Sequence, residues 1–125
     1  MSRNEGIAPG IAEGITVEFK ILVDNNGNAQ VTMTPTVAKL RKDTDYVVIS
    51  SNDPKTAIRY RGTSPFLEPE VAPDQVLLLD GKKGPFKCVT LGDTHHFDCG
   101  RIINGNFQRW GRTQGASTPV GPKGN

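Results

Sequence analysis

Residues 84–103 read GPFKCVTLGDTHHFDCGRII, and this stretch holds both cysteines and both histidines of the chain. Apolar and polar side chains alternate on either side of Gly92-Asp93, as in two strands with one buried face. A glycine in the first position of a two-residue turn suits a type II′ turn, so the stretch predicts a β-hairpin. A two-residue loop would place Cys88 opposite Phe97, and a four-residue loop would place it opposite Cys99. Both registers leave His96 and Asp98 on one side and put these five on the buried side: Phe86, Cys88, His95, Phe97 and Cys99.

The composition of the chain indicates a single small domain made of strands. A length of 125 residues fits one core of modest size. Hydrophobic residues make up 35%, and the 14 glycines and 9 prolines favour short strands and many turns over helices. The net charge of +2 does not by itself indicate a nucleic-acid or membrane partner. No apolar run reaches the ~20 residues of a membrane span and no signal-peptide pattern is visible, so a cytoplasmic location is the default expectation.

Further strands are expected on both sides of this stretch. Alternation over 15–23, followed by a polar turn, predicts a second hairpin. We expect a three-residue loop that pairs Val23 with Val31 and Ile21 with Met33, because this register gathers the apolar residues on one face. The three prolines between 62 and 74 predict a stiff, extended loop anchored in the core by Phe66. Other short strands are expected at 37–40, 46–50, 57–61, 75–79 and 107–110.

Short strands separated by turns, without a helical segment, predict an antiparallel Greek-key β-sandwich, or a barrel with the same kind of connections. We assign residues 15–110 to this domain. Residues 1–14 and 111–125 are rich in small and polar residues, so they are expected to be extended N- and C-terminal arms.

Several short motifs follow one another in an order that is known from a protein family. Residues 35–49 (PTVAKLRKDTDYVVI) combine a proline, a short strand, a polar turn and a valine-rich strand, and the turn 51–54 (SNDP) follows. Residues 86–88 (FKC) and 99–102 (CGRI) stand where a penultimate and a last strand would be. This order resembles the cupredoxin-like sandwich. The motifs SPF at 64–66 and HFDCG at 96–100 are also similar to a group of uncharacterised bacterial proteins with this kind of sandwich.

The resemblance implies the cupredoxin-like fold without a complete copper site. A blue-copper site needs two histidines, a cysteine and usually an axial methionine. The first histidine of the family follows the Asn-rich turn, where this chain has residues 55–57 (KTA), and no methionine follows Cys88. As an alternative, Cys88, His95 and Cys99 share a face and would form a soft site for zinc or Cu(I) in a metal-binding or electron-transfer domain.

The two cysteines also have simpler interpretations, as buried thiols or as a disulfide. Buried thiols are favoured, because opposed strand residues hold their Cβ atoms ~4.5–5.5 Å apart whereas a disulfide needs ~3.5–4.5 Å. No serine or cysteine nucleophile has an evident partner, and no phosphate-binding glycine motif is present. We therefore expect neither catalysis nor a cofactor.

One set of basic and aromatic residues has the composition of a surface for single-stranded nucleic acid. It consists of Arg59, Tyr60, Arg61, Arg101, Arg109 and Trp110. A solvated strand face is the favoured interpretation, because the net charge is small and Tyr60 points inward by alternation. Nucleic acid is therefore not the expected partner.

The arms point instead to contacts between subunits. They contain few large apolar residues, so ordering them requires a neighbouring surface. Ile7, Ile11 and Val120 are the expected anchors, since they are the only branched aliphatic residues in the two arms. The sequence thus predicts a non-catalytic structural or interaction module that works as a subunit of a homo-oligomeric assembly.

Overall fold

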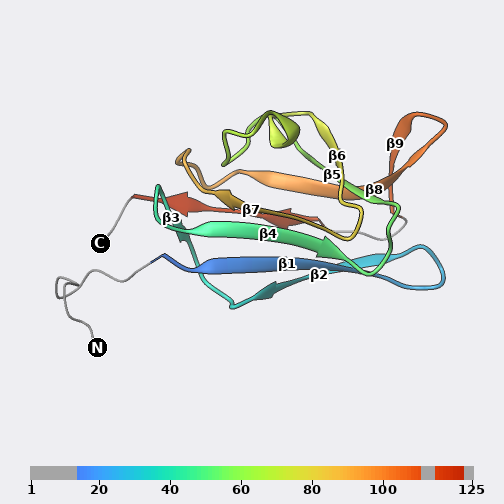
Figure 1. Cartoon of the computed structure of the whole chain (residues 1–125), viewed down its shortest axis with the longest axis horizontal. Coiled ribbons are helices and arrows are strands. Elements are labelled where there is room, and N and C mark those ends of the chain that lie inside the picture. The colour runs from blue at the N-terminus through green and yellow to red at the C-terminus, as the bar shows by residue number, and fades with distance from the viewer. Residues whose placement is uncertain (1–13, 111–114, 123–125) are drawn as a thin grey trace.

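A computed structural model describes residues 14–110 and 115–122 of the chain. The protein is all-β, with several sheets that are mostly antiparallel, and the only helical element among the described residues is a short 3₁₀ turn (Figure 1). The expectation of an all-β protein is confirmed. The strands in chain order are β1 (Thr16–Val23), β2 (Ala29–Thr34), β3 (Leu40–Arg41), β4 (Tyr46–Ser51), β5 (Thr56–Tyr60), β6 (Val76–Leu78), β7 (Lys82–Lys87), β8 (His96–Ile103), β9 (Asn106–Arg109), β10 (Ala116–Ser117) and β11 (Val120–Gly121), with the 3₁₀ turn η1 at Pro69–Val71.

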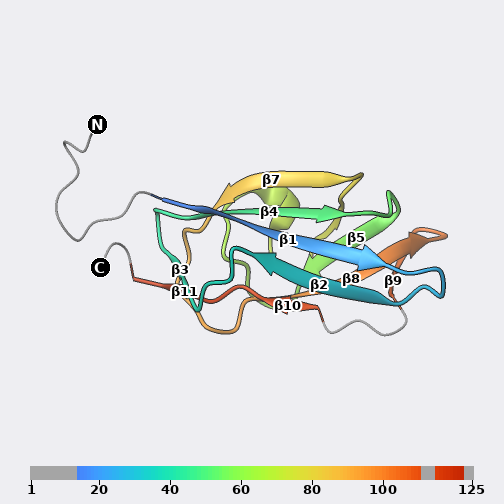
Figure 2. The same cartoon turned by 90° about the horizontal axis from the view of Figure 1, so that it is seen from below.

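These strands form two larger sheets and one small one. The first sheet has the order β2-β1-β4-β7, in which β1 and β4 are parallel and the other pairs antiparallel. The second has the order β10-β8-β5-β6, and β9 pairs with β8 beyond this path. A two-stranded parallel sheet joins β11 to β3 (Figure 2). The β8–β9 hairpin and the β1–β2 turn lie at the same end of the molecule (Figure 1).

The hydrophobic core joins side chains of both larger sheets. Phe19 of β1 meets Phe97 of β8 edge to face, with ring centroids 5.6 Å apart. Tyr60 packs against Phe97 and Phe66 with ring centroids 5.3 Å and 5.6 Å apart, in the edge-to-face geometry that aromatic rings prefer. Phe66 is buried, as expected for the anchor of the 62–74 loop, although this loop also contains η1 and is not extended throughout.

The expected hairpin over 84–103 is wrong. β7 pairs with β4 and β8 pairs with β5, so residues 88–95 cross from one sheet to the other. Gly92 forms a bridge with Val120 instead of a tight turn. The predicted inner face is correct all the same, since Phe86, Cys88, His95, Phe97 and Cys99 are all buried. Alternation identifies the buried face of a strand, but it does not identify the neighbouring strand.

The hairpin between β1 and β2 exists in a register shifted by two residues. Ile21 pairs with Val31 and Val23 with Ala29, in place of the expected Val23–Val31 pair. The turn therefore begins closer to Val23 than expected, and within it the Asp24 carboxylate accepts hydrogen bonds from the backbone N–H groups of Asn26 and Asn28, at 2.8 Å and 3.0 Å. A shift of two residues keeps every side chain on the same face, so the apolar face is unchanged.

The C-terminal segment differs most from expectation. Residues 115–122 belong to the sheets, because β10 pairs with β8 and β11 pairs with β3. Val120 is buried in the core of its own chain, so its expected role as an anchor on a neighbouring subunit is wrong. Backbone hydrogen bonds such as Leu40 N–H to Pro119 O, at 2.9 Å, hold this segment, and composition does not reveal them. The other expected anchors, Ile7 and Ile11, lie outside the described residues.

Candidate functional site: an arginine face on the second sheet

The outer face of the second sheet gathers charged side chains from three strands. Arg59 of β5 lies opposite Asp98 of β8, and Arg109 of β9 lies opposite Gly100, two residues further along β8. Alternation therefore puts Arg59, Asp98 and Arg109 on one side of the sheet. Gly100 allows β9 to approach, because a Cβ atom there would lie 2.2 Å from the carbonyl oxygen of Gln108.

Asp98 is the centre of this group. Its side chain is only 2% exposed, and its Oδ2 lies 2.9 Å from Arg61 Nε. Its Oδ1 lies 4.0 Å from Arg109 Nε, while the side chains of both arginines are 57% exposed. A buried carboxylate requires such partners, since an unpaired buried charge is strongly destabilising. Asp98 therefore holds the inner end of Arg61 and attracts that of Arg109 over a longer distance, while the outer parts of both side chains face solvent.

A third arginine is oriented by an aromatic ring. The guanidinium carbon of Arg59 lies 4.7 Å from the centroid of the Phe107 ring, in cation–π geometry. In the part of the chain that the structure describes, the Nε atom of Arg59 and the Oδ1 atom of Asp98 are buried without a hydrogen-bond partner. We call Arg59, Arg61, Asp98, Phe107 and Arg109 the arginine face. Its three cations outnumber its one carboxylate.

Exposed apolar side chains adjoin the arginine face. Leu78 of β6 lies opposite Ala57, two residues before Arg59, and is 44% exposed. Ile102 of β8 pairs with Phe107 and is 43% exposed. Arginine and large apolar groups together are typical of the centre of protein interfaces.

The basic and aromatic set expected from the sequence is divided by the structure. Tyr60 is buried in the core, as alternation predicts, where burial raises the pKa of its hydroxyl and Thr118 Oγ1 lies 2.8 Å from it. Trp110 is also buried, with the Arg101 guanidinium carbon 4.8 Å from its ring centroid. Phe107, which the sequence analysis did not single out, supplies the aromatic ring of the face. A predicted hairpin that pairs Phe107 with Ile102 across the 104–105 turn would have placed this ring on the same face as Asp98.

The alternative metal site is not assembled. Across residues 14–110 and 115–122, no three side chains of His, Cys, Asp or Glu are placed to hold a metal ion together. The His95 ring uses both nitrogens, because Nε2 donates to Thr90 O at 3.0 Å and Nδ1 lies 2.9 Å from Thr63 Oγ1. The ring is therefore held by loop residues on each side, and Cys88, His95 and Cys99 do not converge as the alternative required.

Both cysteines are buried as free thiols. Cys99 lies opposite Ile58 on β5, and Cys88 follows the end of β7, so neither of the two expected hairpin registers occurs. Burial raises the pKa of each thiol to about 12, with smaller contributions from nearby carboxylates. Such thiols are poor nucleophiles and poor metal ligands.

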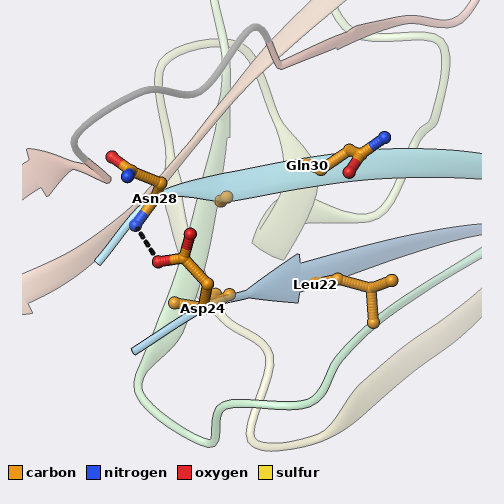
Figure 3. A pocket seen from close by; sticks show the side chains of 6 residues that line it. Leu22, Asp24, Asn28 and Gln30 are labelled. Carbon is orange, nitrogen blue, oxygen red and sulfur yellow. Dashed lines mark hydrogen bonds between the residues drawn. The ribbon is translucent and has the colours of Figure 1, made fainter. Parts of the chain in front are cut away.

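A hollow lies beside the β1–β2 turn (Figure 3). Asp24 is its acidic residue, but its carboxylate accepts the backbone N–H of Asn28, as Figure 3 shows. Backbone hydrogen bonds from Asn28 and Asn26 hold the pKa of Asp24 below its usual value. The Asp24 carboxylate therefore stabilises the turn through these bonds. The hollow is lined by Leu22, Val23, Asp24, Asn28, Ala29 and Gln30.

Comparisons with protein-family models, with curated proteins and with solved structures found no match. Within the described residues, no helix has the length and apolar character needed to cross a membrane.

Proposed function

We propose that this protein is a non-catalytic interaction module that works as a subunit of a homo-oligomeric assembly. The observation that carries the proposal is the arginine face, in which the buried carboxylate of Asp98 holds exposed arginines beside exposed apolar residues. Side chains that are already held in place lose little conformational entropy on binding. The face is therefore suited to binding a partner surface.

The fold that presents this face is, in our proposal, a Greek-key sandwich of the cupredoxin-like kind. Two features support it: the contact of Phe19 with Phe97 between the two larger sheets, and the repeated passage of the chain from one sheet to the other. Consecutive strands β4 and β5, and β7 and β8, lie in different sheets. Such crossing connections are typical of Greek-key sandwiches.

The second sheet is proposed as the surface that contacts other subunits because the two larger sheets have different outer faces. The outer face of the first sheet carries polar side chains such as Lys20 and Thr32, both exposed, and it has no arginine. The second sheet alone combines arginines with exposed Leu78 and Ile102. The N-terminal arm, with Ile7 and Ile11 as its anchors, is proposed to add to the subunit contact.

Sedimentation velocity of the full-length chain over a range of concentrations tests this function. We expect species larger than the monomer whose share rises with concentration. An Ile7→Ser/Ile11→Ser variant should shift this distribution toward the monomer while its far-UV circular dichroism spectrum stays unchanged. A strictly monomeric protein at the highest concentration would contradict the proposal.

A further inference from the structure

One loop of the molecule has the opposite character to the arginine face. Leu67 is 78% exposed, more than any other large hydrophobic side chain in the described part of the chain. It is followed by Glu68 and Glu70, which are half-buried and exposed. We call residues 67–70 the acidic segment. An exposed leucine followed by two carboxylates matches a cationic surface with an apolar margin.

The acidic segment is held rigidly in its outward position. Phe66, just before it, is 5% exposed, and Val71, just after it, is 2% exposed, so both of its ends are anchored in the core. Ser64 Oγ accepts the Phe66 backbone N–H at 3.2 Å, and the Val71 N–H donates to Glu68 O at 3.0 Å. Because Phe66 and Val71 hold the two ends of the segment, the Leu67 side chain stays outside the core of its own chain. A segment held in this way binds without a large cost in conformational entropy.

We infer that the acidic segment of one copy of this chain docks on the arginine face of a second copy. In this contact Leu67 packs on exposed Leu78 and Ile102, and the Glu68 and Glu70 carboxylates pair with the outer parts of the arginine side chains. The inference rests on the proposed function and names the partner of the same surface.

A second copy is the partner because Leu67, the apolar anchor of the acidic segment, is not covered by its own chain. The high exposure of Leu67 shows that its side chain is not packed on the arginine face of its own chain. Each copy thus carries one donor segment and one acceptor face. A contact between two different surfaces is heterologous and joins copies into a ring or an open chain.

Single-stranded nucleic acid fits the face less well. Base stacking needs an accessible aromatic plane, but the Arg59 guanidinium already covers the Phe107 ring at 4.7 Å. The exposed aliphatic groups of Leu78 and Ile102 also offer nothing to a phosphate backbone. A peptide segment with leucine and glutamate contacts both the exposed apolar side chains and the arginines of the surface.

Two variants that spare the Asp98 ion pairs test the inference. The segment variant is Leu67→Ser/Glu70→Arg, and the face variant is Leu78→Glu/Ile102→Glu. All four positions are exposed, so both proteins should keep the wild-type circular dichroism spectrum. Each variant alone should self-associate at least about tenfold more weakly than the wild type in sedimentation velocity, because truncating an interface anchor typically has this effect.

Mixing the two variants supplies the sharper result. The face variant keeps an intact acidic segment and the segment variant keeps an intact arginine face, so a mixture in equal amounts should form a one-to-one heterodimer and no larger species. A matched control, Thr16→Glu/Leu22→Glu, makes the same change in net charge at exposed positions of the first sheet and should assemble like the wild type.

The failure of the inference can be told apart from the failure of the proposed function. If the wild type assembles and both variants assemble equally well, this docking is wrong while the assembly stands. If the wild type is monomeric, the proposed function itself fails. Binding of a poly(dT) oligonucleotide that the face variant loses would overturn the docking in favour of nucleic acid.

Discussion

Arg61 and Asp98 form an ion pair of 2.9 Å whose two members differ sharply in exposure. The carboxylate is 2% exposed and the arginine side chain 57%. The Arg61 Nε group neutralises the buried Asp98 carboxylate, and the exposed part of the arginine side chain remains available to solvent or to a partner.

Removing Arg61 should destabilise the protein more than removing the charge of Asp98. Arg61→Ala leaves the buried carboxylate without its nearest partner, which typically costs about 3–5 kcal/mol. Asp98→Asn leaves an arginine that is largely hydrated, so we expect a loss of about 1–2 kcal/mol. Urea unfolding of both variants measures the difference. Equal losses, or a larger loss for Asp98→Asn, would show that Asp98 does not depend on Arg61.

Both thiols should resist alkylation in the folded protein. Burial raises the pKa of Cys88 and Cys99 from 9.0 to about 12, so at pH 8 little thiolate is present and reagents cannot reach it. We expect labelling by iodoacetamide to be at least about 100-fold slower than in guanidinium chloride, with two thiols modified after unfolding. Rapid labelling of the native protein, or the absence of free thiols after unfolding, would contradict this.

Val120 should contribute to the stability of its own chain. Its side chain is 2% exposed within the core, so Val120→Ala should lower the free energy of unfolding by about 1–3 kcal/mol. Leu91→Ala is the control, because Leu91 is 51% exposed and should change stability by less than about 0.5 kcal/mol. If Val120→Ala altered only the oligomeric state, the original view of residues 111–125 as an arm would be restored.

Asp45 should make stability fall at low pH. Burial raises the pKa of its carboxyl, but hydrogen bonds from the Arg41 side chain and from the backbone N–H groups of Ile15 and Arg41 outweigh this and lower it below 3.8. A group with a lowered pKa in the folded state stabilises the protein above its unfolded pKa, and this stabilisation is lost as pH falls through the folded pKa.

Asp45→Asn tests this pH dependence. The variant should lose about 1–3 kcal/mol at neutral pH, since both carboxylate oxygens of Asp45 accept hydrogen bonds and an amide has only one oxygen to do so. Between pH 5 and the acid-unfolded range its stability should then vary less with pH than that of the wild type. Parallel stability profiles for the two proteins would show that Asp45 does not contribute to acid unfolding.

Much of the strand content was predictable because side-chain alternation is a local property. Phe97 and Cys99 alternate with Asp98, and this order alone placed the first two on the core face of the strand and the third on the opposite face, where ion pairs accompany its burial. Tyr60 and Phe66 were also expected in the core and are buried there. For such residues the sequence was sufficient, because the alternation of apolar and polar residues within a strand identifies its buried face.

The pairing of strands and the candidate site were decided by the tertiary structure. Whether β8 follows β7 in a hairpin or crosses to β5 depends on how the whole set of strands closes around the core, and alternation is the same in both cases. Residues 115–122 join β8 and β3 through backbone hydrogen bonds, which do not depend on side-chain type. The arginine face exists because the sheet brings Arg59, Asp98 and Arg109 together from three strands, and no local pattern encodes that contact.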